Sequence, residues 1–248
     1  MTTTLIVVFC TVILGSSLQR VAGMGLGLIA VPILSLFMGP VEGVMVVNIL
    51  AMINAALTTY TVQANVDWRR FAIIGSVMIL GSIPGAFLIR SVSTAWMLII
   101  VGIVLLAALS VVTLAKRYVP SARGVLPMLA AGVVGGFTNT LAGVAGPVIT
   151  VYAQAARWEH KHFAATLQPL FVVSGGVSFL VKTLVGAGTV AHASWLIWPV
   201  GVTAMFIGIF LGGKISRVVA RAKAHKLALA LALAGGCSAL VRGVLTLL

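Results

Sequence analysis

The chain has 248 residues, of which 61% are hydrophobic and only 8% are charged, and its mean hydropathy is +1.20. A soluble globular domain needs far more polar surface, so this composition excludes one and predicts an integral membrane protein. Sixteen Lys and Arg residues against three acidic ones give a formal charge of +13. These bases lie in short loops between apolar runs, as membrane topology requires, and so do not indicate a nucleic acid-binding protein.

Ten apolar segments follow one another along the chain, and we predict a helix for each. They are expected at residues 4–20, 24–38, 43–63, 70–89 and 96–115, and again at 125–141, 144–156, 162–183, 194–213 and 227–247. Apolar runs near 20 residues are long enough to span about 30 Å of hydrocarbon. A linker at 116–123, with Pro120 and several bases, separates the two sets. We therefore predict an all-α, polytopic membrane protein with one membrane repeat at 1–118 and a second at 119–248.

The second half of the chain repeats the first. At an offset of 120 residues the matched positions share size or polarity: Gly15 with Gly135, Gln19 with Asn139, Gly23 with Gly143, and Asn48 with Gln168. After an insertion near 184–190 the offset becomes 127, and the matches continue: Gly81 with Gly208, and Gly85 with Gly212. A fused pair of like units is a recurrent architecture of secondary transporters, with the substrate held where the units meet.

Basic residues indicate the orientation of the chain. They form four clusters, at 69–70, 116–123, 157–161 and 214–226, and a path of ten segments places all four on one side. The positive-inside rule makes that side cytoplasmic, so both termini are expected outside the cell inner membrane. Because each half has five segments, the second half enters from the opposite face. The two repeats are therefore expected to have inverted topology.

The first two segments of each half are short, and a Gly-rich turn within the apolar region joins them. The turns lie at 19–27 and 139–147. Irregular backbone at membrane depth is tolerated only where it is buried in protein or faces a watery cavity. Each pair is either two full spans or a hairpin that re-enters from one face, and the sequence leaves both open. A helix that begins after each turn offers unpaired N–H groups and a partial positive charge, which favour an anion.

We expect the substrate to bind at these turns and at the polar residues around them. The candidates are Gln19, Arg20, Gly23, Gly25, Asn48, Asn139, Thr140, Gly143, Gly146 and Gln168. Arg20 would supply a full positive charge and a bidentate donor fork, since an Arg buried in a bilayer is costly and marks function. The alternative is that Arg20 snorkels to the interface. The carboxamides would donate to substrate oxygens, or else hydrogen-bond between helices.

The sequence offers little for chemistry other than binding. The three acidic residues, Glu42, Asp67 and Glu159, lie at predicted loop edges. No buried carboxylate is therefore expected to hold Na⁺, H⁺ or a metal ion. No Ser/His/Asp or Cys/His constellation is visible, and we predict neither an enzyme nor a cofactor. The Gly-x-x-x-Gly motifs at 81–85 and 208–212 are expected to let helices approach closely.

The Gly-rich stretches resemble the signatures of a known family. GMGLGLIAVPILSLF at 23–37 resembles the first-half signature of the TauE/SafE sulfite-exporter family. GGFTNTLAGVAGPVITVY at 135–152 resembles its second-half counterpart, with Ala145 where a Gly is expected and Tyr152 in place of the proline seen at Pro32. The sequence at 66–68 resembles a loop motif that follows. The resemblance implies a transporter, mostly an exporter, of small sulfur-containing oxyanions such as sulfite or organosulfonates.

Two other functions are open on the sequence alone. One is import of another inorganic or organic anion, either sulfate-like or a carboxylate. The other, from a different class, is a non-transporting subunit that scaffolds a membrane complex. The expected partners are a small anionic substrate and the lipid bilayer. The sequence leaves open the exact substrate, the direction, the coupling ion and whether the chain forms a homo-oligomer.

Overall fold

Helices make up almost all of the computed structural model, which describes residues 2–23, 25–114, 121–191 and 193–248. The elements in chain order are α1 (Thr2–Ala22), α2 (Leu26–Met38), α3 (Pro40–Val62), the 3₁₀ helix η1 (Gln63–Asn65), α4 (Trp68–Ser76), α5 (Met78–Ser91), α6 (Thr94–Leu114), α7 (Leu126–Ala142), α8 (Gly146–Ala155), α9 (His160–Leu184), α10 (Ile197–Ile215) and α11 (Arg221–Leu247). Within these described residues, seven candidate spans, with α4 and α5 counted as one, are long and apolar enough to cross a membrane. The chain is therefore a multi-pass membrane protein. The boundary predicted between the repeats, after residue 118, lies outside the described residues.

All ten predicted segments are helical, and two of them differ from the prediction. The segment expected at 70–89 is divided at Val77 into α4 and α5. The glycines Gly132 and Gly136 of α7 lie against the backbone at this break. The last segment begins at Arg221 rather than at 227. Alanines that alternate with its bases favour a helix, so part of the basic cluster expected in a loop forms the first turns of α11.

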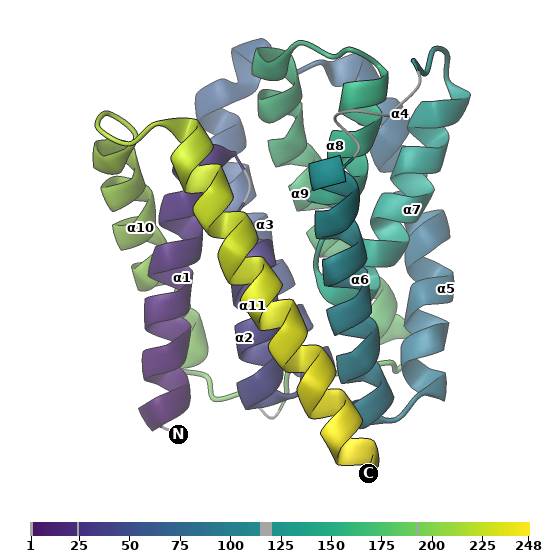
Figure 1. Cartoon of the computed structure of the whole chain (residues 1–248), viewed down its shortest axis with the longest axis vertical. Coiled ribbons are helices and arrows are strands. Elements are labelled where there is room, and N and C mark those ends of the chain that lie inside the picture. Colours follow the sequence, from purple (N-terminus) through teal and green to yellow (C-terminus); the bar gives the residue numbers. More distant parts are fainter. Residues whose placement is uncertain (1, 24, 115–120, 192) are drawn as a thin grey trace.

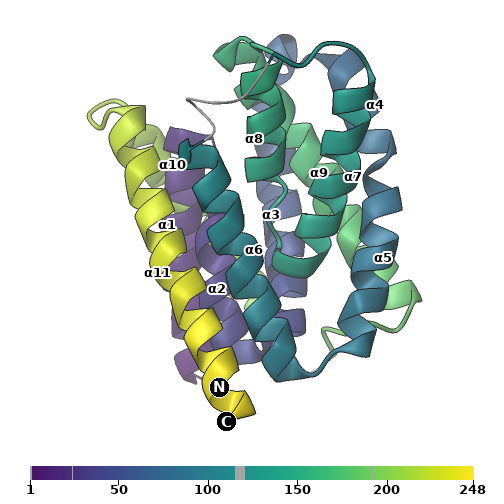
Figure 2. The ribbon, with the colours of Figure 1, turned by 45° about the vertical axis from the view of Figure 1, so that its right-hand side comes forward.

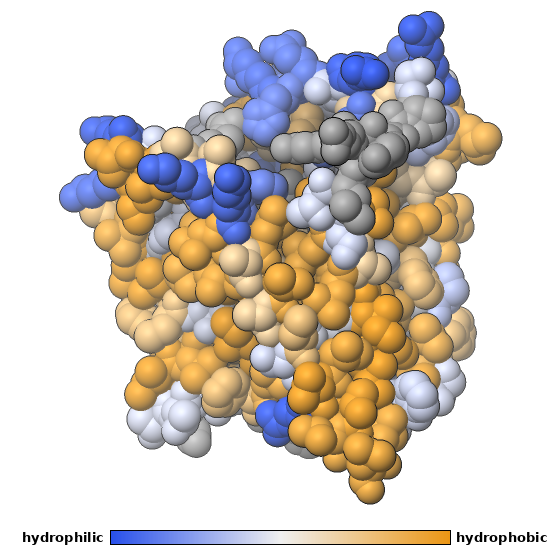
Figure 3. Space-filling view, viewed as in Figure 1, coloured by the Kyte–Doolittle hydropathy of each residue, from blue (hydrophilic) through white to orange (hydrophobic). Residues whose placement is uncertain are grey.

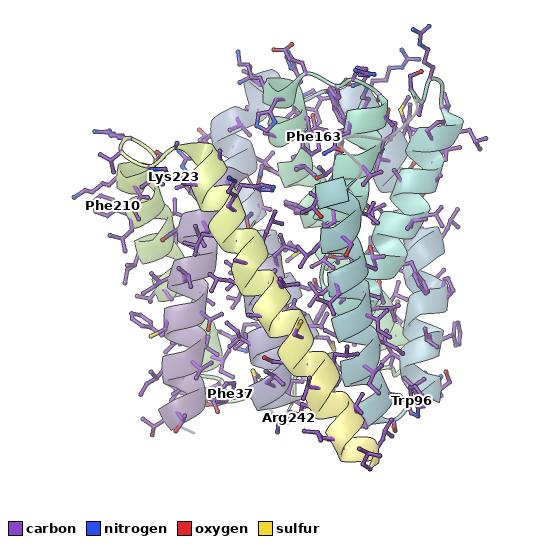
Figure 4. The ribbon with its side chains drawn as sticks, in the orientation of Figure 1. Phe37, Trp96, Phe163, Phe210, Lys223 and Arg242 are labelled. Atoms are coloured by element: carbon purple, nitrogen blue, oxygen red, sulfur yellow. The ribbon has the colours of Figure 1, made fainter. Side chains whose placement is uncertain are left out.

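Both termini lie at one end of the molecule, and the segments that carry the basic clusters at 69–70, 157–161 and 214–226 lie at the other (Figure 1). We call these ends the termini face and the basic face. Hydrophilic side chains gather at the basic face, above a broad hydrophobic belt (Figure 3). Lys223 and Arg242 mark the two ends of α11 (Figure 4). At the termini face Arg242 Nη1 donates to the Leu36 carbonyl oxygen over 2.8 Å, which satisfies a carbonyl in the last turn of α2.

The two halves pack against each other crosswise. Helix α1 packs on α10, and its repeat counterpart α7 packs on α5, which is the counterpart of α10. Helix α3 packs on its counterpart α9, and α6 packs on its counterpart α11 (Figures 1 and 2). Matched helices thus have matched partners, and each half completes its packing on the other.

The first two helices of each half form hairpins. Figure 2 shows α7 and α8 descending from and returning to the basic face, with their turn midway through the molecule. Helix α8 has 10 residues and α2 has 13, so they are about 15 Å and about 20 Å long. Both are shorter than the roughly 30 Å of hydrocarbon that a full span must cross. These lengths indicate that neither α2 nor α8 crosses the hydrocarbon by itself.

Candidate functional site

The two Gly-rich turns begin in the same way. Gly23 and Gly143 have φ angles of 87° and 64°, in the left-handed region where a side chain is strained. Each backbone N–H donates over 2.8 Å to the carbonyl four residues earlier, Gln19 and Asn139 respectively. This contact ends the first helix of each hairpin. The matched glycines therefore end the first helix of the hairpin in both halves.

The turns meet near the centre of the molecule. A Cβ placed on Gly27 would lie 2.6 Å from the Gly143 carbonyl oxygen, so only glycine permits this approach. A small cavity, of about 30 Å³, lies where the turns meet. Six helices or their turns contribute to its lining, which consists of Gln19, Gly25, Gly27, Leu28, Asn48, Ala51, Asn139, Gly143, Val144, Ala145, Gly146, Pro147, Phe171, Ser174 and Gly175.

Two pairs of carboxamides join the halves crosswise beside this cavity. Gln19 Nε2 donates to Gln168 Oε1 over 3.4 Å, and Asn139 Nδ2 donates to Asn48 Oδ1 over 3.3 Å. In each pair a residue of the first helix of one half meets a residue of the third helix of the other. All four side chains are between 2% and 5% exposed. The structure therefore brings together the four amides that match across the repeat.

Further hydrogen bonds tie these amides to the backbone of the turns. Gln19 Oε1 accepts from the Leu26 N–H over 3.2 Å, and Gln168 Nε2 donates to the Gly23 carbonyl over 3.1 Å. Asn139 Nδ2 also donates to the Ser174 carbonyl over 2.9 Å. The amides thus bond between helices, while Gln19, Asn48 and Asn139 also line the cavity. The hydrogen bonds between helices are thus observed, and donation to a substrate stays a prediction for these three residues.

The electrostatics of the cavity come from the backbone. No ionisable side chain is among its lining residues. Helices α2 and α8 begin at it, and neither has an acidic residue in its first turn or a side-chain cap from its N-cap residue. Helix starts carry N–H groups without a partner in their own helix and about half a positive charge each, and of these Gln19 Oε1 takes the Leu26 N–H of α2. Two such ends aimed at one neutral cavity can hold a small anion without a charged side chain.

The structure corrects the expectation that Arg20 is buried beside the turns. Its side chain is exposed, and Nη1 donates to Thr61 Oγ1 over 3.4 Å. A Cβ on Gly212 would lie 2.8 Å from the Arg20 Cβ, so this residue faces the contact between α1 and α10. The counterpart of Arg20, Thr140, packs in the same way on Gly85 in the contact between α7 and α5. The same rotation of matched helices therefore turns both side chains away from the cavity.

We accordingly expect Arg20→Ala to keep its affinity for the anion. An exposed charge contact contributes about 0–1 kcal/mol, so the change should stay within about fivefold. The measurement is equilibrium binding of radiolabelled sulfite to purified Arg20→Ala and to the unaltered protein. A loss of tenfold or more would place the guanidinium in the site after all.

Six predicted residues line the cavity: Gln19, Gly25, Asn48, Asn139, Gly143 and Gly146. Gln168 and Gly23 each lie one hydrogen bond from the lining residue Gln19, because Gln19 Nε2 donates to Gln168 Oε1 and the Gly23 N–H donates to the Gln19 carbonyl. Phe171 and Gly175 also line it and were not predicted. They follow Gln168 at helical spacing on α9, and this periodicity was the signal that could have identified them.

Comparison with known proteins adds one match. A family model described as sulfite exporter TauE/SafE matches residues 7–239, nearly the whole chain. The matched range includes both Gly-rich turns and every lining residue of the cavity. No curated protein and no solved structure gives a significant match.

Proposed function

Since the chain belongs to the sulfite exporter TauE/SafE family, we propose that it moves small sulfur-containing oxyanions, such as sulfite or organosulfonates, out of the cell. The chain is a membrane transporter and not an enzyme. The observation that carries the proposal is the neutral cavity where two helix starts and the carboxamide pairs converge. Its backbone donors suit the oxygens of a small oxyanion, and no carboxylate opposes a negative charge.

We propose that the halves are inverted repeats that expose this cavity to each side in turn. The crosswise helix packing and the crosswise amide pairs support this, since a two-fold axis in the membrane plane would produce both. Along α9 the lining residues Phe171, Ser174 and Gly175 lie between Gln168, which is nearer the basic face, and Ser178, which is nearer the termini face. Asn48 Nδ2 donates to Ser178 Oγ over 2.8 Å. The Gln19–Gln168 pair would then close the cavity toward the basic face, and the Asn48–Asn139 pair toward the termini face.

Transport should respond to membrane potential. Sulfite at neutral pH carries net negative charge, and a cell interior that is negative favours its exit by about 2.3 kcal/mol per charge per 100 mV. The cavity presents no acidic side chain to carry a proton. We expect radiolabelled sulfite flux in proteoliposomes of this chain to follow an imposed potential at equal pH on both sides. Flux that does not respond to the potential and follows only a pH gradient would contradict uniport of the anion. Flux measurements with sulfate, thiosulfate, sulfoacetate and taurine would test which anion is the substrate.

We propose that the basic face is cytoplasmic and that the membrane is the cell inner membrane. Val218, in the α10–α11 loop, is 84% exposed, and Leu248 at the chain end is 97% exposed. In a background with Cys10 and Cys237 replaced by serine, Val218→Cys should resist an impermeant maleimide added to intact cells, while Leu248→Cys should react. The opposite labelling pattern would reverse the orientation.

A further inference from the structure

A lysine lies sealed inside the molecule. Among the described residues Lys182 is the one charged side chain in the buried class, with 0% of its surface exposed. Its Nζ has no hydrogen-bond partner there, and neither the Asp67–Arg70 pair nor the Glu159–His162 pair includes it. Taking an ammonium out of water without a partner is costly, and an ionisable residue within a membrane span is by default a sign of function.

Lys182 lies on the side of α9 that leads away from the cavity. Ser174 lines the cavity, Ser178 accepts from Asn48, and Lys182 follows, so the three residues are spaced four apart on one helix face. At 1.5 Å per residue Lys182 stands about 6 Å beyond Ser178 and about 12 Å beyond Ser174, toward the termini face. A line of polar groups thus runs from the cavity toward an ammonium.

The chain closes over this lysine. After α9 ends, the Ala187 N–H donates to the Lys182 carbonyl over 2.8 Å. Gly188 then packs against Val41 and Met45 near the start of α3. This segment and the start of α3 therefore lie beside the end of α9 that carries the buried lysine. An anion can therefore reach Lys182 only through the interior of the molecule, or while the termini face of the molecule is open.

Two of the three acidic side chains of the sequence lie next to a basic side chain at the basic face. Asp67 lies 3.5 Å from Arg70, and Glu159 lies 3.6 Å from His162. Glu42 is in the first turn of α3, at the same end as Lys182, and the experiment below includes it. The cavity itself has no charged side chain. Lys182 is thus placed to supply the full positive charge that the cavity lacks.

We propose that Lys182 is a second anion-binding site, on the path between the cavity and the termini face. Its ammonium receives the small oxyanion as the anion leaves the amide-lined cavity, and so lowers the barrier to crossing the closed end. This inference rests on the proposed function, because it needs an anion that uses the path.

The test is sulfite flux in proteoliposomes of the full chain. Lys182→Met keeps the length of the side chain and removes its charge, and we expect flux to fall roughly ten- to a hundredfold. Lys182→Arg should retain most of the flux. Lys161→Met is the matched control, since it makes the same change at an exposed position of the same helix and should transport normally.

Each outcome decides between the proposals. Normal flux in Lys182→Met would overturn this inference and leave the proposed function intact, whereas no sulfite flux in the unaltered protein would overturn both. If Glu42→Gln restores flux to Lys182→Met, the lysine serves a charge pair and the anion site is wrong.

If Lys182→Met does not assemble, Lys182→Cys takes its place, in a background with Cys10 and Cys237 replaced by serine. Sulfite flux is then measured before and after alkylation with 2-bromoethylamine, and mass spectrometry verifies the alkylation. Recovery of flux on alkylation supports the site, and unchanged flux overturns it.

Discussion

Replacing Asn139 by aspartate is expected to reduce anion flux by at least about a hundredfold. The new carboxylate has nearly the size of the amide but brings a negative charge into a cavity that has no charged side chain. At 4 Å, two like charges repel by about 4 kcal/mol in surroundings of effective dielectric constant 20, which corresponds to about a thousandfold. The carboxylate would also face two acceptors, Asn48 Oδ1 and the Ser174 carbonyl, which the amide now donates to. The measurement is sulfite flux in proteoliposomes, with equilibrium binding beside it.

Two further variants separate the charge from other effects of this change. Asn139→Leu removes both donations without adding charge, so its loss should be smaller than that of Asn139→Asp. Gln63→Glu makes the same amide-to-carboxylate exchange at an exposed residue of η1 and should transport normally. Flux in Asn139→Asp within threefold of the unaltered protein would move the substrate site away from this cavity.

Gly81→Ala is expected to destabilise the folded protein strongly. A Cβ at Gly81 would overlap the Val133 carbonyl oxygen and lie 2.8 Å from the Phe137 amide nitrogen, both on the backbone of α7. Backbone cannot move aside as the end of a side chain can, so α5 and α7 must separate. Overpacking of this kind typically costs about 1–3 kcal/mol and sometimes more. The measurement is the thermal unfolding midpoint of the purified protein in detergent.

The matched control is Gly213→Ala on α10. No atom lies within 4 Å of a Cβ at Gly213, and alanine is about 1 kcal/mol more favourable than glycine inside a helix. Its unfolding midpoint should therefore stay unchanged or rise. Gly208→Ala, at the position that matches Gly81, should behave like Gly81→Ala, because its Cβ would lie 2.7 Å from the Ile13 carbonyl oxygen. Equal midpoints for Gly81→Ala and Gly213→Ala would contradict this account of the helix contacts.

The sequence by itself determined the class of the protein and most of its framework. Long apolar runs cannot be covered by the few polar residues present, so they require a membrane and predict the ten helical segments. The family resemblance, read from the stretches at 23–37 and 135–152, is confirmed by the match over 7–239. The position of the turns was also readable, because glycines such as Gly23 and Gly143 permit a left-handed backbone that other residues resist.

Only the tertiary structure decided which side chains face the cavity. Gln19 and Arg20 are neighbours in sequence, yet the turn of about 100° between successive helical residues points one at the cavity and the other at α10. In a soluble helix the polar stripe would reveal this rotation, but these helices are apolar on nearly every side. Lys182 illustrates the same limit, since it lies at the end of the segment expected at 162–183 and the sequence alone does not show that it is buried. Packing within the folded molecule buries it instead, and that packing depends on contacts far apart in the chain.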